Sequence, residues 1–94
     1  MESTLTSAPI ALSGRKILVV DDDRLNLRII GGILRGEGYV LAEGNSGERA
    51  LELYAEFKPE LVLLDVVMPG IDGFETCRRL RRIYGDQCAP VIFI

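Results

Sequence analysis

Four short apolar runs recur along the chain, and longer mixed segments separate them. They cover residues 16–20, 39–43, 60–65 and 90–94. The first and third runs, KILVV and ELVLLD, are continuous rather than alternating, which is typical of strands buried on both faces of a parallel sheet. The pattern therefore predicts four strands in a largely buried sheet.

Between these runs, apolar residues recur at helical spacing. The first predicted helix starts after Asp22 or Asp23, either of which is a suitable N-cap, and ends at the glycines of residues 36–38. Gly31 and Gly32 lie inside it and weaken it by roughly 1 kcal/mol each relative to alanine, so we expect a close packing partner there. Its predicted apolar side consists of Leu27, Ile30, Ile33 and Leu34.

Two further helices follow. The second covers residues 45–57, begins at the cap Ser46 and ends before Pro59, with Ala50, Leu53, Tyr54 and Phe57 on its apolar side. The third follows the loop VVMPGIDG, and its predicted inward residues are Phe74, Cys77, Leu80 and Tyr84. Strands that alternate with helices predict an α/β fold, a doubly wound parallel sheet with right-handed crossovers and strand order 2-1-3-4.

The composition limits the classes of protein to which the chain can belong. Ninety-four residues suit one small domain, and 48% hydrophobic with 27% charged residues argues against intrinsic disorder. A net charge of −3 provides no overall basic field for nucleic acid or an anionic membrane, and no apolar run approaches the roughly 20 residues of a membrane span. We expect one domain at residues 15–94, preceded by a flexible leader at residues 1–14, with no nucleic-acid or membrane partner.

Cysteine usage bears on location. Cys77 and Cys88 form no CxxC pair and the chain has no histidine, so it cannot assemble a zinc site alone. Free thiols fit a reducing compartment, and the leader lacks the basic and continuous apolar regions of a signal peptide. We therefore expect a cytoplasmic protein.

Four aspartates follow the first and third strands. Asp21, Asp22 and Asp23 come directly after one, and Asp65 ends the other. If these strands are neighbours, Asp21, Asp22 and Asp65 converge where α/β sheets bind ligands. Clustered carboxylates repel one another unless a cation lies among them, and an all-oxygen site suits Mg²⁺, with Mn²⁺ as the other hard cation. A carboxylate beside such a metal can act as a nucleophile, and Asp65, alone at the end of a central strand, is the better placed one.

The segments VVDDD and LLDVVMPGIDGFE match a family at this point. Together they closely resemble the receiver domain of two-component response regulators, over about residues 16–94. The resemblance implies a flavodoxin-like receiver fold. It also implies a domain that is not an enzyme but accepts a phosphoryl group on Asp65 from a sensor histidine kinase or a phosphotransfer protein. Asp22 matches the direct metal ligand, Asp21 the acid that holds metal through water, and Val67 the position that offers its main-chain carbonyl.

The chain departs from the family pattern after its fourth strand. Family receivers continue to a switch Ser or Thr, a further helix, a fifth strand ending in a phosphate-binding Lys, and a last helix, and none of these occurs in the 94 residues. We therefore expect the fourth strand to be a bare apolar edge. The predicted consequence is self-association through this strand and the uncovered helix face, or binding of a partner that supplies the missing elements.

Three other functions compete with this interpretation. A phosphatase of the haloacid-dehalogenase type would use Asp21 and Asp23, since Asp-x-Asp follows the first strand, although Arg24 stands where that motif usually has Thr or Val. A flavodoxin-like nucleotide binder is disfavoured because the loop after the first strand is acidic. A binding module that needs no phosphorylation is the third.

Several residues have simpler structural interpretations. For Asp23, capping of a helix is favoured over metal binding. For Asp72, capping of the third helix or a turn in the loop is favoured over a chemical role. The arginines at positions 78, 79, 81 and 82 are interpreted as a solvated helix face rather than a nucleic-acid surface, because no aromatic residues are interleaved with them. Cys77 is interpreted as a small core residue.

Overall fold

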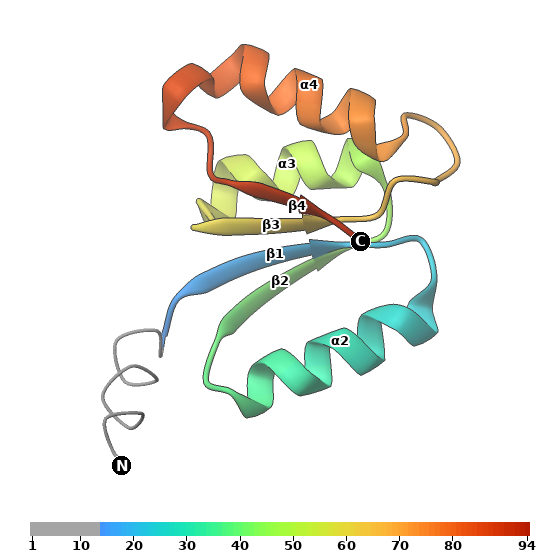
Figure 1. Ribbon diagram of the computed structural model, residues 1–94, viewed down its shortest axis with the longest axis vertical. Coiled ribbons are helices and arrows are strands. Elements are labelled where there is room, and N and C mark those ends of the chain that lie inside the picture. The colour runs from blue at the N-terminus through green and yellow to red at the C-terminus, as the bar shows by residue number, and fades with distance from the viewer. Residues whose placement is uncertain (1–13) are drawn as a thin grey trace.

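The computed structural model describes residues 14–94, which form a sheet between two layers of helices (Figure 1). The expected leader lies outside the described residues except for Gly14. The elements follow in the order β1 (Lys16–Val20), α2 (Arg24–Gly36), β2 (Val40–Gly44), α3 (Gly47–Phe57), β3 (Leu61–Leu64), α4 (Gly73–Tyr84), the 3₁₀ turn η1 (Gly85–Gln87) and β4 (Val91–Phe93). Within residues 14–94, no helix combines the length and apolar character needed to cross a bilayer.

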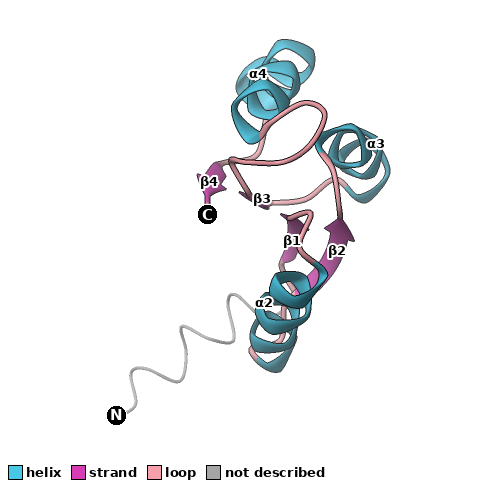
Figure 2. Cartoon of the chain, turned by 90° about the vertical axis from the view of Figure 1, so that its right-hand side faces the viewer, coloured by secondary structure: helices cyan, strands magenta, loops and turns pink. Residues whose placement is uncertain are grey.

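The four strands are parallel and lie in the order β2-β1-β3-β4. Helix α2 covers one face of the sheet, and α3 and α4 cover the other, as Figures 1 and 2 both show. The predicted doubly wound α/β fold and its strand order are therefore confirmed. The predicted second strand, residues 39–43, was one residue early: β2 begins at Val40, and the backbone N–H of Tyr39 donates to the Leu34 carbonyl of α2 at 3.2 Å instead of to a neighbouring strand.

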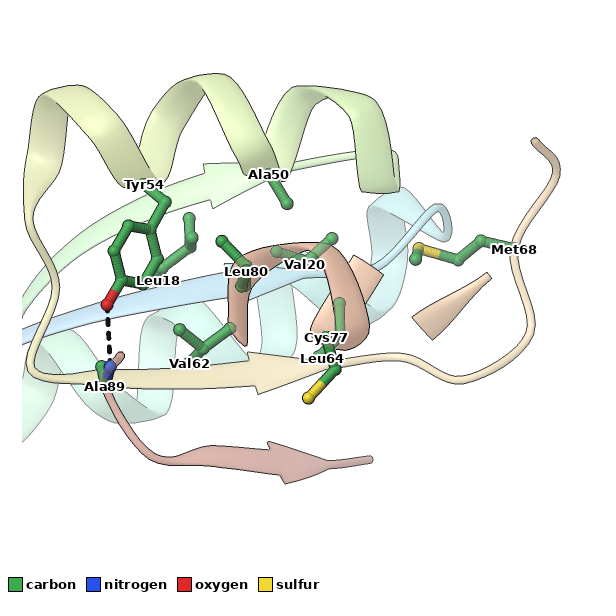
Figure 3. Packing of buried hydrophobic residues seen from close by; sticks show 10 residues of the cluster. All are labelled: Leu18, Val20, Ala50, Tyr54, Val62, Leu64, Met68, Cys77, Leu80 and Ala89. Atoms are coloured by element: carbon green, nitrogen blue, oxygen red, sulfur yellow. Dashed lines mark hydrogen bonds between the residues drawn. The ribbon is translucent and has the colours of Figure 1, made fainter. Parts of the chain in front are cut away.

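The larger core lies between the sheet and the helices α3 and α4 (Figure 3). β1 and β3 each supply alternate residues to it, and the cluster consists of Leu18, Val20, Ala50, Tyr54, Val62, Leu64, Met68, Cys77, Leu80 and Ala89. The Tyr54 hydroxyl accepts a hydrogen bond from the Ala89 backbone N–H at 2.7 Å, so its polar end is satisfied inside the core. Cys77 is buried here, as predicted.

The smaller core lies under α2, where Ile17, Val19 and Leu27 are buried. Ile30 and Leu34 pack against it, as the helical spacing predicts. The prediction was wrong for Ile33, whose side chain is 62% exposed. Ile33 belongs to a second row on α2, with Leu25 and Ile29 four residues apart, and that row faces away from the sheet.

Two details of the glycine and helix predictions also need correction. Gly31 is buried, and a Cβ there would collide with the carboxylate of Glu43, but a Cβ at Gly32 would meet nothing within 4 Å. The expected close contact therefore exists at one glycine of the pair. Phe74 is not inward: it is 51% exposed and packs edge-on against Phe93, with ring centroids 5.0 Å apart, because the buried row of α4 consists of Gly73, Thr76, Cys77 and Leu80.

Candidate metal and phospho-acceptor site

The predicted cluster of aspartates forms where β1 and β3 end. Asp21 directly follows β1 and Asp65 directly follows β3, and these strands are hydrogen-bonded neighbours. Carboxylate oxygens of Asp21, Asp22 and Asp65 all lie within 4.8 Å of one another. The order of the strands thus brings Asp65 beside Asp21 and Asp22, which precede it by more than forty positions in sequence.

Asp21 is the buried member of the group, with 4% of its surface exposed. Its Oδ1 accepts a hydrogen bond from the Asp23 backbone N–H at 2.9 Å, and its Oδ2 accepts one from the Asn26 side-chain amide at 3.3 Å. Both oxygens are therefore held in place. Sequence reasoning missed Asn26; the signal that could have found it is its place in the first turn of α2, next to the loop that carries Asp21.

Asp22 and Asp23 have different surroundings although they are adjacent. The Asp22 side chain is exposed and joins the cluster, whereas Asp23 accepts hydrogen bonds from the backbone N–H groups of Leu25 at 2.9 Å and Asn26 at 3.4 Å. Asp23 is therefore the N-cap of α2, as predicted. The Oδ1 of Asp23 is engaged in that cap, so the position of Asp23 is explained by capping, without the role that the Asp21–Asp23 phosphatase interpretation gives it.

Asp65 is half-buried beside the other two carboxylates. Burial raises the pKa of its carboxyl group, the nearby charge of Asp21 raises this pKa further, and a hydrogen bond from the Val67 backbone N–H partly offsets the rise. The ionised form is therefore destabilised in its present surroundings. A cation among the three carboxylates would relieve this cost.

The loop after Asp65 is fixed at both ends. Met68 is buried in the larger core, and Asp72 caps α4 by accepting from the Glu75 backbone N–H at 2.8 Å, as predicted. The Gly73 N–H donates to the Val66 carbonyl at 2.8 Å, and a Cβ at Gly73 would collide with the Asp65 backbone carbonyl. The glycine therefore permits α4 to begin directly beside Asp65. Val67, which lies between Val66 and the buried Met68, is 80% exposed.

The donor set fits Mg²⁺. Two oxygens bound to one Mg²⁺ lie about 3 to 4.2 Å apart, given metal–oxygen distances of about 2.1 Å in an octahedron. The oxygens of the three aspartates approach this spacing, and a ligand that acts through water spans the remainder. The set contains no nitrogen or sulfur ligand, and Mg²⁺ keeps several waters in sites of this kind.

The basic residues of α4 lie away from this chemistry. Arg78 and Arg79 both pair with Glu75, at 2.8 and 2.9 Å, and the Arg81 Nε donates to the Cys77 sulfur at 3.3 Å. These contacts join residues within α4. They agree with the predicted solvated helix face.

Comparisons with known proteins agree with this geometry. Residues 17–94 match the model of the response regulator receiver domain family. The chain is 46% identical over 78 residues to the transcriptional regulatory protein AfsQ1 of Streptomyces coelicolor, covering 83% of this chain and 33% of that protein. It is 40% identical over 80 residues to the DNA-binding response regulator MtrA of Mycobacterium tuberculosis, covering 85% and 34%. The chain thus spans about a third of the length of these relatives.

Solved structures include relatives with the same fold. The response regulator TrrA of Thermotoga maritima, in complex with Mg²⁺-BeF, superimposes with a TM-score of 0.78 and 35% sequence identity, covering 84% of this chain and 67% of that one. Chemotaxis response regulator CheY4 of Vibrio cholerae gives a TM-score of 0.80 at 25% identity, covering 86% and 68%.

Proposed function

The chain belongs to the response regulator receiver domain family, and from that premise we propose that Asp65 accepts a phosphoryl group from a sensor histidine kinase or a phosphotransfer protein. The observation that carries the proposal is the convergence of Asp21, Asp22 and Asp65 at the carboxyl ends of β1 and β3. The loop that follows Asp65 is anchored on both sides, so the acceptor has a defined position.

Each member of the cluster has a distinct proposed role. The Asp22 side chain is exposed and does not cap a helix. It would ligate Mg²⁺ directly, together with an oxygen of Asp65 and the backbone carbonyl of Val67. Asp21, buried and held by Asn26, would bind the metal through water. Mn²⁺ is the other cation that this oxygen set accommodates. TrrA, which shares the fold, was solved in complex with Mg²⁺-BeF, and this supports the proposal that the chain binds Mg²⁺.

The proposed reaction needs one nucleophile and local charge neutralisation. An Asp65 carboxylate oxygen forms a bond to phosphorus while the bond from phosphorus to the donor's histidine nitrogen breaks, and the electron pair of that bond returns to the nitrogen. The product is an acyl phosphate on Asp65. When bound, Mg²⁺ neutralises phosphoryl oxygens that the three carboxylates would otherwise repel. The segment is a receiver, so we expect only phosphoryl acceptance and loss, not turnover of a separate substrate.

The proposal extends to the setting of the domain. Cys77 and Cys88 are free thiols, which supports the expected cytoplasmic location. The name of AfsQ1 describes a transcriptional regulatory protein and that of MtrA a DNA-binding response regulator, and an output of either kind is one that phosphorylation of Asp65 would control in a longer protein.

The test is intact-mass measurement after incubation with acetyl phosphate and Mg²⁺. The wild-type chain should gain the mass of one phosphoryl group, and this gain should disappear in Asp65→Asn and in the presence of EDTA. Asp72→Asn, which changes a capping carboxylate outside the cluster, is the matched control and should still be phosphorylated. A wild-type chain that gains no mass would indicate a binding module without phosphorylation, and continuous hydrolysis of acetyl phosphate without a covalent product would indicate a phosphatase. Either result contradicts the proposal.

A further inference from the structure

A second candidate site lies on the other side of β1 from Asp65. β2 and β3 flank β1 on opposite sides, and beyond the carboxyl end of β2 there is an open cavity of about 480 Å³. It is bordered by the first turns of α2, the end of β2 and the start of α3. Its lining consists of Arg24, Leu27, Arg28, Glu43, Asn45 and Arg49. None of these residues belongs to the aspartate cluster.

The charges of this cavity are unusual for a chain with a net charge of −3. Three of its six lining residues are arginines, and its one carboxylate, Glu43, pairs with Arg35 outside the lining at 3.0 Å. Arg49 pairs with Glu52 at 2.8 Å. Within residues 14–94, Arg24 and Arg28 form no ion pair, so two guanidinium groups are available to a ligand.

The arrangement of these groups selects a class of ligand. Arg24 and Arg28 are four residues apart on α2 and therefore project from the same side of the helix. Guanidinium groups match phosphate oxygens with paired hydrogen bonds, and the side-chain amide of Asn45 adds a further donor. Leu27 lies between the two arginines in sequence and supplies an apolar wall. The volume is within the range of pockets that bind small organic molecules.

We propose that this cavity binds a small organic phosphate, with the phosphate group on Arg24 and Arg28 and the organic part against Leu27. The site is independent of the phospho-acceptor, because it uses no residue of the aspartate cluster and needs no divalent metal. Binding should weaken as salt is raised, since the attraction is electrostatic and the arginines are exposed.

The test is titration of the 94-residue chain with AMP, inorganic phosphate and adenosine. Binding is measured by isothermal titration calorimetry and by changes in amide chemical shifts. EDTA is present throughout, so that no metal recruits anions to Asp65. AMP should bind more tightly than inorganic phosphate, adenosine should not bind, and the shifts should concentrate at residues 24–28 and 43–49. The double variant Arg24→Gln/Arg28→Gln should weaken AMP binding about tenfold or more, and Arg82→Gln, an exposed arginine on α4, should leave it unchanged.

Three results would overturn the proposal. They are the absence of saturable AMP binding at low millimolar concentration, equal binding of AMP and adenosine, and equal losses in the double variant and in Arg82→Gln. Both substituted residues of the double variant are exposed, and unchanged amide shifts elsewhere in its spectrum establish that it has folded. Loss of acetyl-phosphate labelling in Asp65→Asn has no bearing on this outcome, so the two proposals fail separately.

Discussion

Replacing Asp65, the proposed acceptor, by asparagine should make the metal-free protein more stable. Asp65 is crowded by Asp21 and Asp22, and burial together with the Asp21 charge raises the pKa of its carboxyl group. An aspartate whose pKa is raised by folding destabilises the native state when ionised. Asp65→Asn removes this charge, keeps the size of the side chain and still provides an oxygen that accepts the Val67 N–H hydrogen bond.

The separation of the carboxylates sets the magnitude. At 4.8 Å, the widest spacing within the cluster, two unit charges repel by about 0.9 kcal/mol in water and by about 3.5 kcal/mol at an effective dielectric constant of 20. Asp65 is half-buried and Asp22 is exposed, so we take the lower end and expect a gain of about 1–2 kcal/mol in the free energy of unfolding from the two pairs. For a domain of this size, each 1 kcal/mol corresponds to about 4–8 °C in Tm.

The assay is thermal unfolding, monitored by circular dichroism, in EDTA and in millimolar Mg²⁺. In EDTA at neutral pH, Asp65→Asn should melt above the wild type, and Mg²⁺ should raise the wild-type Tm more than that of the variant, since the variant lacks one carboxylate of the proposed metal site. The control Asp86→Asn, an exposed carboxylate in η1, should change neither value appreciably.

Measurements at lower pH give a second check on the sign of the predicted change in stability. The cost of ionised Asp65 is present above its folded pKa and is lost as the pH falls toward the ordinary aspartate value, so the gap in Tm between variant and wild type should narrow there. A variant that melts below the wild type in EDTA, or a gap that widens in acid, would refute the electrostatic account of this cluster.

Two further predictions concern packing. Gly47→Ala should destabilise the chain by about 1–3 kcal/mol in urea unfolding, because its Cβ would collide with Thr76 across the α3–α4 contact, whereas Gly32→Ala, with nothing within 4 Å, should stabilise α2 by about 0.5–1 kcal/mol; equal effects would contradict this account. The 94-residue chain should self-associate through β4, where Ile92 is 51% exposed, and static light scattering should show dimers or larger species that Ile92→Lys reduces. A wild-type monomer at high micromolar concentration would exclude this interface.

The strands, the helices and their order were predictable because each is indicated by a local sequence pattern that has one physical cause. Continuous apolar runs predicted the buried strands, and the alternation of strands and helices predicted the parallel order that the structure shows. Capping residues located the helix starts, and Ser46 and Asp72 each accept a backbone N–H three residues ahead. The helix starts are therefore better defined by the sequence than the strand limits.

The errors concern which apolar rows are covered. Helical spacing places Ile33 and Phe74 near the inward residues of their helices, but a period identifies residues that share a row, not the row that meets the sheet. Ile33 shares its row with the exposed Leu25 and Ile29, and Phe74 reaches Phe93 instead of the core. Asn26 was missed for a related reason, since a polar side chain that supports Asp21 has no periodic signature.

The candidate site was predictable because aspartates in the two loops divide their roles by position. In each loop, the aspartate at the strand end joins the cluster, as Asp21 and Asp65 do, and the aspartate before the helix caps it, as Asp23 and Asp72 do. The strand fixes the carboxylate beside it, while the free N–H groups of a new helix attract the carboxylate that precedes them. In each of these loops, the aspartate at the end of the strand therefore joins the carboxylate cluster, and the aspartate that precedes the helix caps it. The like-charge repulsion in the cluster is tolerated because caps and core, which do not depend on metal, hold both loops in place.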